Sequence, residues 1–181
     1  MKIGIALSGG GIRGIAHAGV LKALEDNNIK IDIIGGTSCG SMVASLYAMG
    51  YTPEEIYSLF RKYAKDIATI NTKPIIAGLQ SHIFKSKKVF SSLKDGKIIE
   101  NVYNKMALQK KIKNIEEIQM PLVIPSVDIT ESKEYVFTNK IPQNAEDKTQ
   151  YITNITVGKA VRASSSFPAV FNPCLMGKHA F

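Results

Sequence analysis

The sequence is poor in cysteine and has no long apolar run, and each shortage excludes a class of protein. Two cysteines among 181 residues, Cys39 and Cys174, cannot build a disulfide framework, which fits a reducing compartment. No apolar run approaches the roughly 18 residues that a membrane-spanning helix needs. The His, Cys and carboxylate residues show no metal-ligand spacing, so we expect neither a metal nor another cofactor.

Negative charge is also scarce relative to positive charge, and the formal net charge is +8. The lysines gather in four short stretches, 61-RKYAK, 85-KSKK, 94-KDGK and 110-KKIK. Solvated helix faces and loops explain such stretches, and contact with an anionic membrane surface is the functional alternative. Aromatic residues do not interleave with the lysines, so no nucleic-acid partner is expected. Charge and glycine follow Met1 too soon for a signal peptide, which predicts a cytoplasmic protein, at most peripheral to a membrane.

Hydrophobic periodicity predicts strands that alternate with helices in a single domain over residues 1–181. Strands are expected at 2–8, 31–36, 121–129 and 134–138, and helices from the glycine-rich loop to about 27, at 41–50, 53–66, 97–108 and 157–164. The segment Thr52–Glu55 is a capping box, and Gly50 is suited to end the helix before it. Residues 67–96 are predicted to be an irregular excursion near the site, and 139–151 a polar loop. The order of the elements predicts an α/β fold with a mainly parallel sheet.

A glycine-rich loop follows the first predicted strand in the sequence 6-ALSGGGIRG. Gly9, Gly11 and Gly14 match G-x-G-x-x-G, a spacing that lets backbone N–H groups approach an anion. A dinucleotide site also requires an acidic residue at the end of the next strand. The acid of that strand, Asp32, stands at its start. A nucleotide-binding module is therefore an alternative, but the sequence lacks the acidic residue that such a module needs at the end of the second strand.

The second predicted strand runs into the sequence 36-GTSCG, which is G-x-S-x-G at a strand–helix junction. This context is typical of a nucleophile elbow, in which a tight turn lifts the serine hydroxyl clear of the backbone. Gly36 and Gly40 avoid clashes with the neighbouring strand and helix, and the helix N-terminus stabilises negative charge. Ser38 is the predicted nucleophile. Cys39, one residue past the apex, is expected to pack inward.

A serine nucleophile needs donors for the oxyanion of its tetrahedral intermediate. If the first two strands are neighbours, the loop Gly9-Gly10-Gly11 lies at the same sheet edge as Ser38. Its backbone N–H groups can then face the oxyanion rather than a pyrophosphate. Arg13 would add positive charge there, for a substrate phosphate or for a carboxylate that holds the loop.

Three motifs in one order, 9-GGGIRG, 36-GTSCG and 163-ASSSFPAVF, resemble the patatin-like phospholipases, whose pattern is G-G-G-x-R-G, G-x-S-x-G and A-S-x-x-x-P-x-x-F. The resemblance covers nearly the whole chain. It implies a three-layer α/β/α sandwich and hydrolysis of lipid acyl esters by a Ser–Asp dyad without histidine. By this resemblance Ser38 is the nucleophile, and Gly9, Gly10 and Gly11 with Arg13 form the oxyanion loop.

The sequence departs from the family pattern at the catalytic aspartate, which belongs to a D-G-G or D-G-A motif shortly after the third motif. The sequence ends at 177-GKHAF, so the partner aspartate is expected beyond Phe181 and the 181-residue chain is expected to be inactive. Asp95-Gly96 is interpreted as a turn. Asp128, at the end of a predicted strand, is better placed, but its expected role is to cap the turn 129–133.

The three histidines, His17, His82 and His179, are expected to pack in the core or lie on the surface. His179 could imitate a triad histidine, but the order Ser…Asp/Glu…His would need a whole hydrolase fold in too few residues. The leading hypothesis is a serine lipid acyl hydrolase of phospholipase A type acting on a lipid or phospholipid. A carboxylesterase or thioesterase on soluble substrates, the nucleotide-binding module and a catalytically silent membrane-binding relative are the alternatives.

Overall fold

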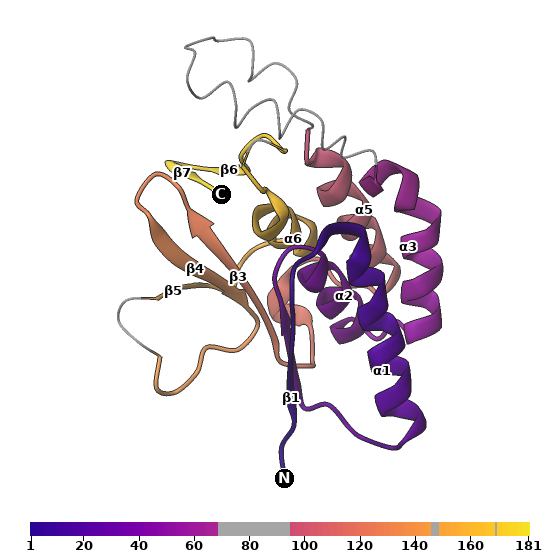
Figure 1. The fold of residues 1–181 in the computed structure, drawn as a ribbon. Helices are drawn as coiled ribbons and strands as arrows, with labels where there is room; N and C mark the ends of the chain where they lie inside the picture. The colour runs from indigo at the N-terminus through magenta and orange to yellow at the C-terminus, as the bar shows by residue number, and fades with distance from the viewer. Residues whose placement is uncertain (69–94, 146–148, 169) are drawn as a thin grey trace.

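The computed structural model of the protein describes residues 1–68, 95–145, 149–168 and 170–181 (Figure 1). The predicted excursion at 67–96 lies almost entirely outside them, as does His82. Five strands form one sheet in the order β1-β2-β3-β4-β5. Their bounds are β1 Gly4–Leu7, β2 Ile33–Gly36, β3 Leu122–Asp128, β4 Lys133–Thr138 and β5 Gln150–Ile152.

The sheet is mixed, with β1, β2 and β3 parallel to one another. β4 returns antiparallel to β3 after a short turn, and β5 then pairs parallel with β4. In the register, Leu7 lies beside Gly36, so the chain leaves β1 and β2 at the same sheet edge. This edge is where the glycine loop and the elbow were both expected.

The helices follow the predicted positions closely. α1, α2 and α3 come before the undescribed segment, and α5 and α6 come after it. Their bounds, with the two 3₁₀ turns, are η1 Gly11–Ile15, α1 Ala16–Asp26, α2 Cys39–Ala48, α3 Pro53–Ala68, α5 Lys97–Gln109, η3 Ile115–Glu117 and α6 Val157–Ser165. The capping box before α3 is formed, since Thr52 N donates to Glu55 Oε2 at 2.9 Å and Glu55 N donates to Thr52 Oγ1 at 3.2 Å.

The described helices gather on one side of the sheet (Figure 1). β1, β2 and β3 advance across the sheet in one direction, and right-handed crossovers between such strands place their helices on one face. α2 packs on β1 and β2, and α6 packs on β3. Of the three layers that the resemblance implies, the described residues form the sheet and one helical side. Ile33 and Val127 on the strands remain exposed.

The core lies between the sheet and these helices. Ile34, Leu122, Ile124 and Phe137 from the strands are fully buried, and they face Val43, Val157 and Val161 from α2 and α6. Burial of each such side chain contributes about 1.5–3 kcal/mol to the free energy of unfolding. The hydrophobic effect therefore holds β2, β3 and β4 against α2 and α6. Among the described helices, none combines the length and apolarity required to cross a bilayer.

One strand, β5, was not predicted. Residues 139–151 were expected to be a loop, but Gln150 and Tyr151 begin β5. This strand has no local pattern of its own and depends on pairing with β4. The C-terminal residues form a small hairpin of β6 (Leu175–Met176) and β7 (His179–Ala180).

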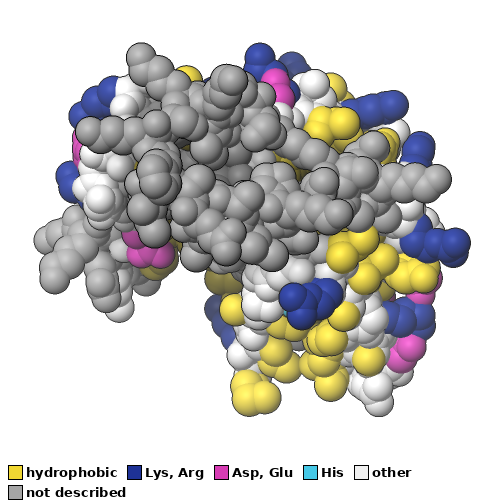
Figure 2. Space-filling model, turned by 45° about the horizontal axis from the view of Figure 1, so that its top comes forward, with side chains coloured by type: hydrophobic (Ala, Val, Ile, Leu, Met, Phe, Trp, Pro, Cys, Tyr) yellow, Lys and Arg dark blue, Asp and Glu magenta, His cyan; other side chains and the backbone are white. Residues whose placement is uncertain are grey.

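Among the described residues, the Lys and Arg side chains visible in Figure 2 do not form one continuous basic surface. Most of them lie apart from one another, with hydrophobic side chains between some of them. Lys110 has a structural role, since its Nζ donates to Gly50 O at 2.9 Å and lies 4.3 Å from the centre of the Tyr51 ring. The stretch 85-KSKK lies outside the described residues. Contact with an anionic membrane stays a prediction.

Candidate active site

Ser38 stands at the turn between β2 and α2 in a conformation that few non-glycine residues adopt. Its φ is 54° and its ψ is −123°, and it is the residue that precedes the first turn of α2. Such a backbone costs about 1–3 kcal/mol and persists only where the surroundings enforce it. Thr37 O accepts from Gly40 N at 2.9 Å and Ser38 O accepts from Met42 N at 3.1 Å, so the strained residue is held on both sides.

The two elbow glycines stand where the chain passes close to itself. A Cβ at Gly36 would lie 2.3 Å from the backbone of Gly40, and a Cβ at Gly40 would lie 2.2 Å from Leu7 O. Real side chains essentially never approach backbone atoms so closely. The predicted reason for these glycines therefore agrees with the geometry.

The glycine loop lies directly beside Ser38. A Cβ at Gly9 would stand 3.4 Å from Ser38 Cβ. Gly10 and Gly11 have φ values of 157° and 59°, and a Cβ at either would meet nothing within 4 Å. The ring of His17 supports the loop from α1, because its Nε2 lies 2.9 Å from Ser8 O.

Gly14 and Arg13 have different environments. A Cβ at Gly14 would lie 2.4 Å from Cys39 Sγ, so this glycine allows η1 to pack on the start of α2. Cys39 is buried as predicted, and burial raises the pKa of its thiol, which keeps it a neutral packing group. Arg13 is exposed on η1, and no described carboxylate lies within ion-pair distance of it.

The third motif contributes a contact that the sequence did not reveal. Ser164 Oγ accepts a hydrogen bond from Ser38 N at 3.1 Å and donates one to Pro125 O at 2.7 Å. This hydroxyl therefore ties α6 to both the elbow and the middle of β3. No local pattern could have predicted this pairing, because 126 positions separate the two serines.

These elements surround an open cleft of about 930 Å³. The glycine loop and the elbow form one wall, and β3 with the third motif forms the other. Its lining includes Gly9, Gly10, Gly11, Ser38, Phe171 and Phe181. Ser38 is partly exposed to this cleft, and no described residue forms a hydrogen bond with its hydroxyl.

A family model for patatin-like phospholipases matches residues 5–181. The chain belongs to the patatin-like phospholipase family. Among curated proteins, lysophospholipase NTE1 of Kluyveromyces lactis is 40% identical over 102 residues, which is 53% of this chain and 7% of that protein. Lysophospholipase NTE1 of Candida albicans is 48% identical over 68 residues, which is 38% of this chain and 5% of that protein. The chain thus spans a small part of these relatives.

Solved structures share the fold of this patatin-like chain. ExoU in its complex with SpcU, from the type III secretion system of Pseudomonas aeruginosa, aligns with a TM-score of 0.56 at 19% identity and covers 94% of this chain and 37% of that one. VipD from Legionella pneumophila aligns with a TM-score of 0.55 at 15% identity and covers 99% of this chain and 45% of that one. The predicted family and the α/β fold class are confirmed.

Three of the described aspartates of this patatin-like chain accept hydrogen bonds from the backbone. Asp32 Oδ2 accepts from Ile3 N at 2.8 Å, at the end of the sheet remote from the elbow. Asp95 Oδ1 accepts from Lys97 N at 3.0 Å in the turn before α5, in line with its interpretation as a turn residue. Asp128 caps the turn after β3 as predicted, since its Oδ1 accepts from Thr130 N at 3.0 Å.

Asp128 has a second role that was not predicted. His179 Nδ1 lies 2.7 Å from its Oδ2, and Ala180 N donates to its Oδ1 at 3.1 Å, so the buried carboxylate holds β7 against the end of β3. Burial alone would raise the pKa of Asp128, but the hydrogen bonds from His179, Thr130 and Ala180 outweigh it and lower this pKa well below its usual range.

One cluster contains potential metal ligands, which the sequence spacing did not suggest. Atoms of Asp128, Glu131 and His179 lie within 4.8 Å of one another. Glu131 is paired with the ammonium groups of Lys133 and Lys178, each at 3.1 Å. The two neighbouring ammonium groups would repel a metal ion, and both carboxylate oxygens of Asp128 already accept hydrogen bonds. We therefore assign the cluster to hydrogen bonding that holds the hairpin.

Replacing Asp128 by alanine is expected to release the β6–β7 hairpin, because several buried donors lose their acceptor. Amide hydrogen exchange at Ala180 should accelerate strongly, and the urea midpoint should fall. The pKa of Asp128 is lower in the folded than in the unfolded chain, so its contribution exists above the unfolded pKa of about 3.9 and disappears as pH falls below it. The difference in midpoint between Asp128→Ala and wild type should therefore shrink below about pH 4.

Asp26→Ala, at an exposed ion pair within α1, is the matched control and should leave Ala180 protected. Unchanged exchange at Ala180 in Asp128→Ala would contradict the role of this carboxylate.

Proposed function

We propose that the protein is a serine lipid acyl hydrolase of phospholipase A type, in which Ser38 attacks ester-linked acyl chains of phospholipids or lysophospholipids. The observation that carries the proposal is the strained Ser38 beside a glycine loop with unoccupied space above it, in one open cleft. The curated relatives named lysophospholipase support the substrate class.

In the proposed reaction, Ser38 Oγ attacks the ester carbonyl carbon while its proton passes to a general base. Backbone N–H groups of Gly9, Gly10 and Gly11, with the positive charge of Arg13 nearby, stabilise the oxyanion. The intermediate collapses, the alcohol leaves with a proton from the base, and the acyl group stays on Ser38. Water, deprotonated by the same base, then releases the fatty acid and restores the serine.

We propose that the base is an aspartate beyond Phe181, as the resemblance implies. Phe181 lines the same cleft as Ser38. Asp26, Asp32, Asp95 and Asp128 are engaged elsewhere by backbone or side-chain donors. None of them lines the cleft.

The test of the function is release of fatty acid from lysophosphatidylcholine and phosphatidylcholine by the full-length protein. A preference for these lipids above their aggregation threshold supports a lipid hydrolase. Equal or better turnover of a soluble ester such as p-nitrophenyl butyrate would favour a general esterase. Saturable binding of NAD or ATP without acyl release would favour the nucleotide-binding module.

A protein of residues 1–181 is expected to hydrolyse p-nitrophenyl butyrate at least about 100-fold more slowly than a chain extended past the expected D-G-G or D-G-A motif, because general base catalysis typically contributes 10²–10⁴-fold. Circular dichroism would establish that both chains are folded. Equal rates would place the base within residues 1–181, and Glu134, which lines the cleft, would become the residue to replace.

Replacing Gly11 by alanine is expected to reduce kcat by about 10²-fold with little change in KM, because aligned N–H donors act mainly in the transition state. The φ of 59° would strain alanine and shift the loop, although the space around it is open. Gly50→Ala is the matched control, since Gly50 also has positive φ and open space but lies at the far end of α2. A rise in KM with unchanged kcat would contradict the oxyanion role.

A further inference from the structure

The backbone of Ser38 is determined by the orientation of the two peptide groups that flank it. Each peptide group is planar, so its C=O and its N–H turn together. The peptide between Thr37 and Ser38 sets the φ of Ser38 at 54°, and the peptide between Ser38 and Cys39 sets its ψ at −123°. Because a backbone of this kind relaxes unless its surroundings hold it, both peptide groups need partners.

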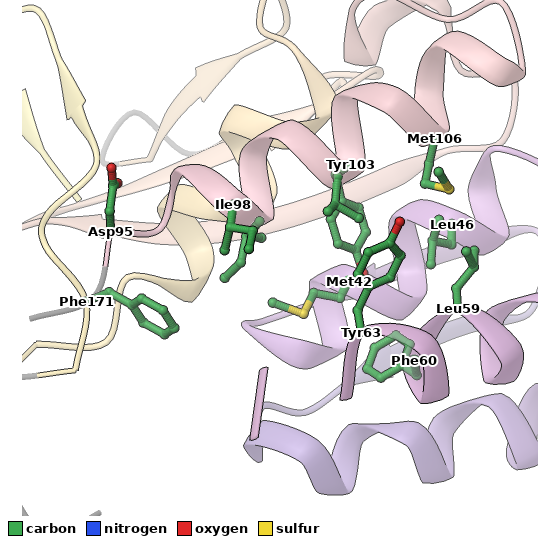
Figure 3. A pocket seen from close by; sticks show the side chains of 12 residues that line it. Met42, Leu46, Leu59, Phe60, Tyr63, Asp95, Ile98, Tyr103, Met106 and Phe171 are labelled. Carbon is green, nitrogen blue, oxygen red and sulfur yellow. The ribbon is translucent and has the colours of Figure 1, made fainter. Parts of the chain in front are cut away.

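The second of these peptides is held by α2. Ser38 O accepts hydrogen bonds from Met42 N at 3.1 Å and from Ser41 Oγ at 2.6 Å. Apolar packing in turn anchors the helix, since Met42 lines the same small apolar pocket as Phe60 of α3 and Tyr103 of α5, and all three are buried (Figure 3). The ψ side of the elbow is therefore fixed by the helix itself.

The first peptide is held at its two ends by different parts of the fold. Within the elbow, Thr37 O accepts from Gly40 N at 2.9 Å. At the other end, Ser38 N donates to Ser164 Oγ at 3.1 Å, and Ser164 belongs to α6. The Ser164 hydroxyl therefore opposes rotation of this peptide from outside the elbow.

The Ser164 hydroxyl has a fixed direction of its own. A serine hydroxyl has one proton to donate, and here it goes to Pro125 O of β3 at 2.7 Å, which leaves a lone pair for Ser38 N. The pairing of β2 with β3 extends to Gly35 and Val123, two residues before Pro125. The hydroxyl thus joins the chain that leaves β2 to β3 just beyond the last strand pair.

We propose that Ser164 is a positioning residue for the reaction of Ser38, because its hydroxyl holds the Thr37–Ser38 peptide and so keeps the nucleophile in its strained conformation at the cleft. The assignment rests on the proposed function, and it adds a side chain that acts through the backbone of Ser38. One consequence concerns the oxyanion. The N–H of Ser38 already has Ser164 as its acceptor, so the donors for the oxyanion come from other backbone groups, such as those of the glycine loop.

Replacing Ser164 by alanine in the full-length protein removes both hydrogen bonds and keeps the Cβ. For p-nitrophenyl butyrate, kcat is expected to fall by about 10- to 100-fold with KM within about twofold of wild type, because a small displacement of a reacting group costs up to about 10²-fold in rate while contacts with the bound ester remain. Labelling of Ser38 by a fluorophosphonate should slow to a similar extent.

Two further variants test whether the hydroxyl itself is responsible. Ser164→Thr keeps a hydroxyl on the same Cβ at a half-buried position, and it should restore most of kcat. Ser165→Ala is the matched control, since Ser165 is the next residue of α6 and its buried hydroxyl forms no hydrogen bond with the described residues. Its kcat should equal that of wild type. A loss of kcat shared by Ser164→Ala and Ser164→Thr would overturn the proposal, because the loss would not follow the hydroxyl.

Urea unfolding separates positioning from a purely structural contact. If Ser164→Ala lowers the urea midpoint but the folded protein keeps the kcat and labelling rate of wild type, the proposal is overturned and Ser38 stays the nucleophile of the proposed function.

Amide hydrogen exchange at residue 38 supplies a readout that needs no turnover. Exchange should accelerate by about tenfold in Ser164→Ala, the equivalent of one lost hydrogen bond, and should not change in Ser165→Ala. If wild type hydrolyses no ester but exchange follows this pattern, the proposed function fails while the hold of Ser164 on the elbow is supported. Unchanged exchange in Ser164→Ala would contradict that hold directly.

Discussion

Replacement of Ser38 by alanine in the full-length protein should reduce acyl release by on the order of 10⁴- to 10⁶-fold, the loss typical of a removed nucleophile. The residual rate would come from binding and from the donors of the glycine loop. The hydroxyl forms no hydrogen bond with the described residues, and alanine can occupy the same strained backbone at a similar cost. The free energy of unfolding should therefore change little.

Ser45→Ala is the matched control for this substitution. Ser45 lies in the same helix, and its buried Oγ donates to Met42 O at 3.2 Å without facing the cleft. A fluorophosphonate should label wild type and Ser45→Ala but not Ser38→Ala. Turnover within tenfold of wild type in a folded Ser38→Ala protein would exclude Ser38 as the nucleophile.

The positions of most elements could be predicted because their signals are local. The capping box at Thr52 and Glu55 and the turn at Gly50 are patterns of neighbouring residues, and they determine where α2 ends and α3 begins. β5 could not be predicted in the same way. Gln150 and Tyr151 are a strand only because β4 offers an edge to pair with.

The same distinction between local and long-range signals applies to the candidate site. The elbow and the glycine loop are local motifs, and the parallel pairing of β1 with β2 is the common arrangement of consecutive strands joined by a helix, so their proximity could be inferred. The contact of Ser164 with Ser38 and that of His179 with Asp128 join residues 126 and 51 positions apart. Such contacts depend on how the sheet, α6 and the hairpin pack together. One sequence contains no local sign of them.

The largest expected effect on stability is that of Gly40→Ala. The added Cβ would lie 2.2 Å from Leu7 O, 2.7 Å from Leu7 C and 2.8 Å from Ser8 O. These are backbone atoms at the end of β1, so no side chain can rotate to make room. Either α2 or β1 must move, and β1 is held by its register with β2. Overpacking of this kind costs about 1–3 kcal/mol and occasionally more, and we expect the upper end here.

Urea unfolding would measure this loss, and fluorophosphonate labelling of Ser38 would report the elbow separately. Labelling should fall together with stability, because a shift of α2 moves the serine that precedes its first turn. Gly19→Ala is the matched control, since a Cβ at Gly19 in α1 would meet nothing within 4 Å, and alanine there should stabilise the helix by about 0.5–1 kcal/mol. If Gly40→Ala unfolded at the same urea concentration as wild type and labelled equally well, the close approach of α2 to β1 could not be what requires glycine in the elbow.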